Sequence, residues 1–171
     1  MEFLVSANTD IGLVKDTNQD GMTVKVFDTC QGKMAFAVLC DGMGGLAKGE
    51  VASTTVICAF NDWAYTVLPE LCKAPIQDYE IRSQWERIVV KQNELIKAYG
   101  AGQGINLGTT IVVMLVTETR YYLAESCDVS PDGLTYTVKL RDNLNVGVLN
   151  VNAQIREIIK LMKICFYLRL F

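Results

Sequence analysis

The chain has 171 residues, half of them apolar, which is enough for the core of a single domain. Its formal net charge of −3 gives no reason to expect nucleic acid or an anionic membrane as the main partner. Histidine is absent from the sequence, which excludes serine–histidine triads, histidine general bases and histidine-ligated zinc.

The six cysteines show no pattern of a metal site or of cysteine-based catalysis. They form no C-x-x-C pair, and none is followed by the arginine that a cysteine-based phosphatase loop requires. Cys40, Cys58 and Cys165 lie in apolar stretches, where cysteine behaves as a small hydrophobic residue. Since the N-terminus also lacks a charged-then-apolar signal segment, we expect a reduced, cytoplasmic setting.

The first part of the chain predicts two strands around an acidic loop. Weak alternation over Phe3 to Ala7 predicts a first strand, and residues 9–21 are rich in loop formers and acids. Met22 to Phe27 alternates again, and Asp28 to Lys33 is expected to form a turn.

The stretch from Met34 to Ser53 predicts a buried strand, a glycine-rich loop and a helix. The apolar run Ala35 to Cys40 ends abruptly in Asp41, and four glycines follow before a helical pattern begins at Glu50. A carboxylate at the end of a buried strand requires a cation or hydrogen-bond donors, and glycines let the backbone approach a ligand closely. The pattern therefore favours a binding site over a simple turn.

Two nucleotide-binding motifs fit this stretch poorly. Residues 42–47 match G-x-G-x-x-A, but the acidic residue at the expected distance, Asp62, falls inside the predicted helix and not at the end of a second strand. Asp41 would also place a negative charge beside a pyrophosphate. The phosphate loop G-x-x-x-x-G-K-[ST] fails because Glu50 follows Gly49.

Asp20 and Asp41 each flank a predicted strand of an antiparallel arrangement. If these strands are neighbours, both carboxylates converge at one end of the sheet. Clustered oxygens without histidine or a thiolate pattern suit Mg²⁺ or Mn²⁺ better than zinc.

Two long helices and one further strand follow. Apolar stripes predict helices over Glu50 to Val67 and Asp78 to Tyr99, and these stripes indicate core packing. Gly100 to Gly104 is expected to form a flexible turn, and Thr109 to Thr117 the next strand.

Three motifs carry a family resemblance. Thr9 to Asp20 together with Cys40 to Ser53 resembles the first two motifs of the metal-dependent, PPM-type (phosphatase 2C) serine/threonine protein phosphatases in their bacterial form. Asn106 to Thr110, followed by an apolar strand, resembles the third motif. The resemblance covers about the first 120 residues. It implies a two-metal hydrolase with an α-β-β-α sandwich fold.

The resemblance also implies roles for individual residues. Asp41 would bridge two Mn²⁺ or Mg²⁺ ions, the Gly42 carbonyl would bind one of them, and Asp20 would support the cluster through water. Lys15 stands where the family usually has an arginine that grips the substrate phosphate, and lysine lacks the bidentate fork of arginine. Gln19 replaces a usual glutamate, which removes one negative charge from the surroundings of the metal ions. The implied reaction is attack of a metal-held water on phosphoserine or phosphothreonine.

Agreement with the family ends beyond Tyr122. Residues 130–135 and 141–146 resemble two later motifs that supply metal aspartates, which would make Asp132 and Asp142 ligands. The family separates these motifs by a helical stretch, whereas only ten residues separate Asp132 from Asp142 here. An internal deletion that retains the metal aspartates and a chance match to a common turn both stay open.

The sequence thus predicts an α+β domain over residues 1–152, with a mainly antiparallel sheet carrying two long helices. Residues 153–171 are expected to form an amphipathic tail, too short and too charged to span a bilayer. The predicted function is a Mn²⁺- or Mg²⁺-dependent phosphatase that acts on a phosphorylated protein. The alternatives are a noncatalytic phosphatase-like module that binds a phosphoprotein or another partner, and a shortened chain that self-associates through an uncovered sheet face.

Overall fold

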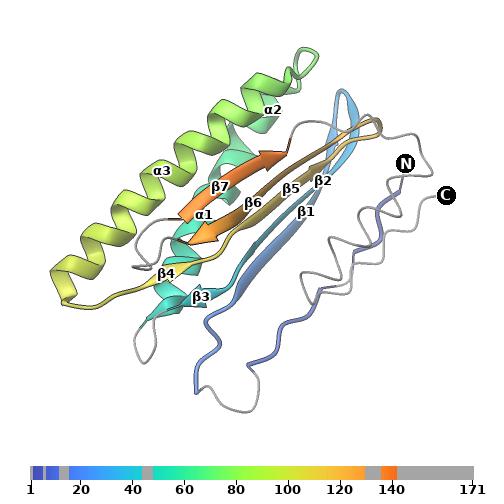
Figure 1. Cartoon of the computed structure of the whole chain (residues 1–171). Coiled ribbons are helices and arrows are strands. Elements are labelled where there is room, and N and C mark those ends of the chain that lie inside the picture. Colours follow the sequence, from blue (N-terminus) through green and yellow to red (C-terminus); the bar gives the residue numbers. More distant parts are fainter. Residues whose placement is uncertain (1, 6, 12–15, 44–47, 130–135, 142–171) are drawn as a thin grey trace.

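A five-stranded antiparallel sheet carries two long helices on one face in the computed structural model, which describes residues 2–5, 7–11, 16–43, 48–129 and 136–141 (Figure 1). The sheet has the order β1-β2-β5-β6-β7, and every neighbouring pair is antiparallel. This arrangement confirms the predicted α+β class with its antiparallel sheet and two long helices. The strands of this sheet are β1 (Gly21–Thr29), β2 (Gly32–Cys40), β5 (Val112–Val116), β6 (Tyr121–Val129) and β7 (Tyr136–Arg141).

Two shorter strands form a second small sheet, and three helices complete the described elements. The small sheet pairs β3 with β4, and the short helix α2 follows α1 closely. The elements are β3 (Gly42–Met43), β4 (Gly108–Thr109), α1 (Gly49–Thr66), α2 (Leu68–Leu71) and α3 (Asp78–Gln103).

Strand β2 is buried on both faces, which explains its continuous apolar sequence. Phe36 and Val38 face the helices and belong to the main core, whereas Ala35 and Ala37 face the other side together with residues of β5 and β6. Central strands covered on both sides lose the alternation that marks a strand with one exposed face.

Four aromatic side chains bind the helices to the sheet. Phe36 of β2 lies 5.6 Å from Trp63 of α1 between ring centroids, and Trp63 lies 5.7 Å from Trp85 of α3 in an edge-to-face arrangement. Phe60 packs edge-to-face on Trp85 at 6.1 Å. These rings bury large areas in favourable geometries and fix α1 and α3 over β2.

The N-terminal segment covers part of the opposite face of the sheet (Figure 1). Phe3 and Val5 pack against the cluster formed by Ala37, Met114 and neighbouring residues. The predicted strand over Phe3 to Ala7 is wrong, because the described residues of this segment belong to no strand. Its alternating pattern reflects burial of one side against the sheet, without the ladder of hydrogen bonds that defines a strand.

The helices begin where the sequence predicts, but α3 ends later. The expected turn over Gly100 to Gly104 is wrong, because α3 continues through Gln103. Gly104 ends the helix in the left-handed conformation at φ 65°, and the Ile105 N–H donates to the Gly100 carbonyl at 3.0 Å. Glycine is the usual residue at this position after a helix, whereas glycines two and four residues earlier are tolerated inside it.

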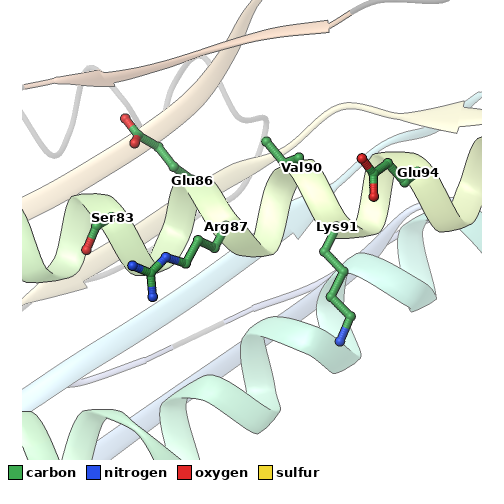
Figure 2. Close-up of a pocket in the computed structure, with 6 residues that line it drawn as sticks. All are labelled: Ser83, Glu86, Arg87, Val90, Lys91 and Glu94. Carbon is green, nitrogen blue, oxygen red and sulfur yellow. The ribbon is translucent and has the colours of Figure 1, made fainter.

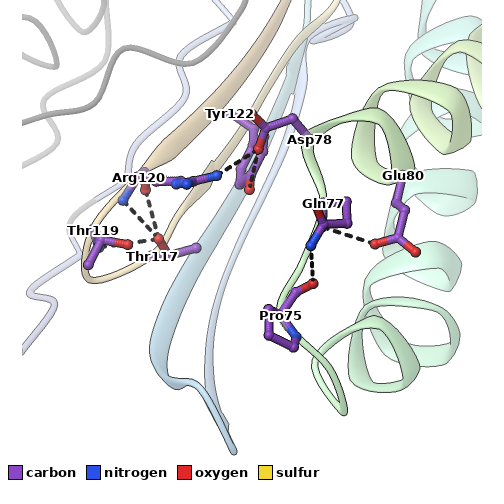
Figure 3. A network of polar contacts seen from close by, with 8 residues as sticks. All are labelled: Pro75, Gln77, Asp78, Glu80, Thr117, Thr119, Arg120 and Tyr122. Atoms are coloured by element: carbon purple, nitrogen blue, oxygen red, sulfur yellow. Dashed lines mark hydrogen bonds and ion pairs between the residues drawn. The ribbon is translucent and has the colours of Figure 1, made fainter.

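A polar network anchors the start of α3 to the β5–β6 turn (Figure 3). Gln77 and Glu80 form a reciprocal capping box. The Arg120 guanidinium donates to the Asp78 carboxylate at 2.9 Å, and the Tyr122 hydroxyl donates to the same carboxylate at 3.3 Å. The network fixes the helix axis relative to the sheet.

Three other expectations need correction or lie outside the described residues. The predicted turn over Asp28 to Lys33 is present but shorter: Cys30 and Gln31 form it, since the β1–β2 ladder continues to the pair Thr29↔Gly32. The predicted strand Thr109 to Thr117 divides into β4 and β5. Residues 142–171, which include the predicted tail, lie outside the described part of the chain. Within the described part, no helix has the length and apolar character needed to cross a membrane.

Candidate functional site

The β1–β2 ladder places the carboxylates of Asp20 and Asp41 at the same end of the sheet. The ladder pairs Gly21 with Cys40, and the Gly42 N–H donates to the Gln19 carbonyl at 3.2 Å, so the same register continues beyond both strands. Asp20 and Asp41 are therefore directly opposite each other. In an antiparallel ladder, a pair of this kind, next to a hydrogen-bonded pair, has Cα atoms about 4.5 Å apart and side chains on the same face.

Strand alternation assigns both carboxylates to the sheet face away from the helices. Asp41 shares its face with Leu39, which packs on the cluster opposite α1 and α3, and Asp20 shares its face with Met22, the partner of Leu39. Both aspartates are exposed residues. Two exposed carboxylates thus stand side by side at the open end of an apolar sheet face.

This donor set fits a divalent cation as part of a coordination shell. Like charges directly opposite each other in a sheet are destabilising, and a cation between them relieves the repulsion. Carboxylate and carbonyl oxygens are the ligands that Mg²⁺ and Mn²⁺ prefer. Within the described residues, no three or more Asp, Glu or Cys side chains gather closely enough to hold a metal ion. A two-ion centre thus needs ligands beyond Asp20 and Asp41.

The backbone of Asp41 is held on both sides by the third predicted motif. The Asp41 N–H donates to Thr110 Oγ1 at 3.1 Å, and the Thr110 N–H donates to the Asp41 carbonyl at 2.9 Å. The Thr109 hydroxyl lies 3.1 Å from the same carbonyl, and the β3–β4 ladder pairs Gly42 with Thr109. These contacts fix the direction in which Asp41 leaves the sheet.

Glycine contacts bring the start of α1 against the first motif. A Cβ atom at Gly42 would lie 2.4 Å from the Gln19 carbonyl oxygen and 2.5 Å from the Gly49 carbonyl oxygen. A Cβ atom at Gly49 would lie 2.9 Å from the Gly42 carbonyl carbon. Ser53 closes the arrangement by donating its hydroxyl to the Gln19 carbonyl at 2.8 Å. Only glycine permits this approach of three backbone segments.

Gln19 has a packing role that the sequence did not predict. The sequence suggested that it lowers the negative charge around the metal ions. In the structure it is 7% exposed, its side chain lies beside Gly49, and strand alternation assigns it to the face opposite that of Asp20. Its carbonyl receives two hydrogen bonds, from Gly42 and Ser53. Gln19 therefore connects the first motif, the residue after Asp41 and the start of α1.

Lys48 is a residue that the sequence did not single out. It adopts a left-handed conformation at φ 65° just before α1. Its ammonium group donates to the Tyr99 hydroxyl of α3 at 3.2 Å and lies 5.7 Å from the centre of the Tyr99 ring. No local sequence signal marks this contact, because the partner is on another helix. The contact ties the residue before α1 to α3.

The thiol of Cys40, next to Asp41, is not suited to nucleophilic chemistry. Burial raises the pKa of Cys40 to about 12, and a hydrogen bond with Thr109 lowers it in part. The thiol therefore stays protonated at neutral pH, whereas a nucleophilic cysteine must ionise. This agrees with the absence of a cysteine-phosphatase loop from the sequence.

A shallow hollow on α3 lies apart from the predicted site. It has a volume of about 360 Å³ and is lined by residues of both charges (Figure 2). Glu86, Val90 and Glu94 point to one side of the helix, and Arg87 and Lys91 to the other. None of its lining residues is a predicted site residue. The other predicted site residues, Lys15, Asp132 and Asp142, lie outside the described part of the chain.

Comparison with known proteins gives one curated relative and several solved structures. No protein-family model matches the chain. The "Putative protein phosphatase 2C-type" of Streptococcus pyogenes serotype M6 is 30% identical over 159 residues, which cover 90% of this chain and 60% of that protein. The chain thus spans about 60% of the length of this relative.

Solved phosphatases share the fold. The S. agalactiae serine/threonine phosphatase matches with a TM-score of 0.59 and 24% identity, over 91% of this chain and 61% of that one. The catalytic domain of the serine/threonine protein phosphatase PstP, solved with two manganese ions, matches with a TM-score of 0.54 and 24% identity, over 97% of this chain and 66% of that one. The predicted resemblance to the PPM-type, phosphatase 2C family is therefore confirmed, in sequence by the streptococcal relative and in fold by the solved phosphatases.

Proposed function

We propose that the chain is a metal-dependent serine/threonine protein phosphatase whose site lies at the open end of the β1–β2 pair. One observation carries the proposal: the three motifs that resemble the family converge on Asp41. The first motif contributes Asp20 opposite Asp41, the second contributes Gly42, and the third holds the Asp41 backbone through Thr109 and Thr110.

In this proposal Asp41 and Asp20 are the first oxygen donors of a Mn²⁺ or Mg²⁺ centre, with the Gly42 carbonyl as a further ligand. Asp132 and Asp142 would supply the carboxylates that the described residues lack. The manganese ions named for the PstP catalytic domain support this choice of metal. When bound, divalent ions would activate a water for attack on phosphorus and neutralise charge on the phosphate oxygens.

The residues of the chain have three tasks in this reaction. Asp20 and Asp41 hold negative charge at a fixed spacing, since the backbone of Asp41 cannot rotate while it is bonded to Thr110. Lys15 would hold the substrate phosphate as a point charge. The glycines at 42 and 49 let the backbone segments beneath the aspartates pack closely, which holds this end of the sheet in place.

Hydrolysis of p-nitrophenyl phosphate tests the proposal. We expect turnover with Mn²⁺, none with a chelator, and a fall to the background rate for Asp41→Asn. Asp62→Asn is the matched control, because Asp62 is an exposed aspartate of α1 and not a predicted ligand. A phosphoserine or phosphothreonine peptide then tests the substrate class. Metal-independent turnover, or full activity of Asp41→Asn, would contradict the proposed centre.

The same assay separates a complete centre from a noncatalytic module. The double variant Asp132→Asn/Asp142→Asn should lose activity if both residues bind metal, and should retain it if they form an ordinary turn. If the cooperatively folded wild type shows no turnover with either metal, the enzyme proposal fails. Mn²⁺ binding that is lost in Asp41→Asn, without turnover, would then indicate a phosphatase-like binding module.

A further inference from the structure

The turn of the β1–β2 hairpin is fastened to the end of α2 by two side chains. The Cys30 thiol donates to the backbone carbonyl of Cys72 at 2.6 Å, and the Gln31 side-chain amide donates to the same carbonyl at 2.8 Å. Gln31 also donates to the Ala74 carbonyl. Carbonyls at the end of a helix lack hydrogen-bond donors within the helix, and Cys30 and Gln31 act as these donors. The contact thus brings two cysteines distant in sequence into one place.

The Cys30 sulfur lies beside the residue that carries the second thiol. Standard carbonyl geometry puts the Cys30 sulfur within about 5 Å of the Cys72 Cα atom, given the observed hydrogen bond. The Cys72 thiol is also within hydrogen-bonding reach of the Thr29 side chain, next to Cys30 in the sequence. Cys30 and Cys72 are therefore neighbours in the fold, as the two members of a thiol–disulfide exchange pair must be.

We propose that Cys30 and Cys72 are a thiol–disulfide exchange site that reacts with low-molecular-weight disulfides. The Cys30 thiolate attacks one sulfur of the small disulfide, breaks its S–S bond and releases the first small thiol. The Cys72 thiolate then attacks the Cys30 sulfur of the mixed disulfide and releases the second small thiol. The two protein thiols are oxidised, the small disulfide is reduced to two thiols, and the two protons pass to these products.

The surroundings of the two thiols assign this order. Cys30 is exposed, so a small disulfide can reach it first. Cys72 is buried, with its sulfur 3.9 Å from that of Met34. Burial raises the pKa of the Cys72 thiol, a hydrogen bond with Thr29 lowers it, and the neighbouring Cys30 raises it further. The second step is therefore the slow one, and it accelerates as pH rises because more Cys72 is ionised.

The exchange site is separate from the proposed phosphatase site. Cys30 lies at the closed end of the hairpin, and Asp41 follows the open end of a nine-residue strand. Nine strand residues span about 30 Å. Disulfide formation should therefore leave metal-dependent turnover unchanged, and its test needs no activity measurement.

The test uses the full chain with glutathione disulfide as the probe. After incubation, free thiols are blocked with N-ethylmaleimide and chymotryptic peptides are mapped by mass spectrometry. We expect a Cys30–Cys72 cross-link formed faster at pH 9 than at pH 7, and a higher thermal midpoint that dithiothreitol reverses. Cys72→Ser should stop at a glutathione adduct on Cys30, and Cys30→Ser should leave Cys72 reduced.

Cys58→Ser is the control, because Cys58 is also exposed but lies on α1. This variant should form the same cross-link as the wild type. A stable glutathione adduct on Cys30 of the wild type, with Cys72 still free, would overturn the proposal. A cross-link from Cys30 to any other cysteine would overturn it as well. The same holds if glutathione disulfide modifies neither Cys30 nor Cys72 in the folded protein.

Discussion

Replacement of Gly42 by alanine should destabilise the protein strongly. The added Cβ atom would lie 2.4 Å from the carbonyl oxygen of Gln19 and 2.5 Å from that of Gly49. Both neighbours are backbone atoms, so no side-chain rotation can remove the overlap. The first motif or the start of α1 must move away.

The expected magnitude follows from the contacts that this movement breaks. Overpacking in a well-packed region costs about 1–3 kcal/mol. Displacing Gln19 also lengthens the hydrogen bonds from Gly42 at 3.2 Å and from Ser53 at 2.8 Å, each of net value about 1 kcal/mol. We therefore expect the free energy of unfolding to fall by about 3–5 kcal/mol, a large part of the roughly 5–15 kcal/mol typical of a domain.

Urea unfolding followed by tryptophan fluorescence measures this change, because Trp63 and Trp85 are buried in the core. Gly102→Ala is the matched control, since a Cβ atom at this helical position meets nothing within 4 Å. Alanine there should stabilise the protein by about 0.5–1 kcal/mol through the lower flexibility of the unfolded chain. If Gly42→Ala unfolds within about 1 kcal/mol of the wild type, the reasoning from close backbone approach is refuted.

Three further predictions concern charge and pH. Asp41→Asn should raise the thermal midpoint of the metal-free protein, because it removes repulsion with Asp20; a gain that does not shrink in high salt would contradict this cause. Burial raises the pKa of Cys40 from 9.0 to about 12. The native state therefore keeps this thiol protonated at pH values where the unfolded chain ionises it, so the free energy of unfolding declines as pH rises from 9 toward 12. The decline is at most about 4 kcal/mol. Urea titrations at pH 8 and 11 should show a smaller decline for Cys40→Ala. Arg120→Ala should lower the free energy of unfolding by no more than about 1 kcal/mol, because its ion pair with Asp78 is exposed. Asp78→Ala should lower it further, because this variant also removes the acceptor of the Tyr122 hydroxyl.

The elements that the sequence predicted well are those with a local cause. The start of α3 follows from its apolar stripe and capping box, and the buried strand β2 follows from an uninterrupted apolar run. The end of α3 was missed because three glycines lie close together and only Gly104 adopts the left-handed conformation. Strands β6 and β7 were not predicted, since their segments replace the expected family motifs.

The charged residues of the candidate site were predictable from the sequence, but the contacts that hold the backbone around them were not. An aspartate after a buried strand is visible in the sequence, and the antiparallel arrangement allowed the opposition of Asp20 and Asp41 to be expected. The packing role of Gln19 and the contact between Lys48 and Tyr99 were not visible, because each depends on a partner far along the chain. Contacts of this kind follow from the tertiary fold and have no local pattern.

The structure separates the source of stability from the proposed source of function. The aromatic core lies between the helices and the sheet, with Phe36 and Phe60 fully buried, whereas Asp20 and Asp41 are exposed and oppose like charges. Like charges directly opposite each other in a sheet cost stability, so the placement of these two aspartates outside the core is the expected property of a site completed by a cation. Asp41→Asn should therefore gain stability while it loses Mn²⁺-dependent turnover. If stability and turnover fall together, Asp41 is a structural residue and the cation site must lie elsewhere.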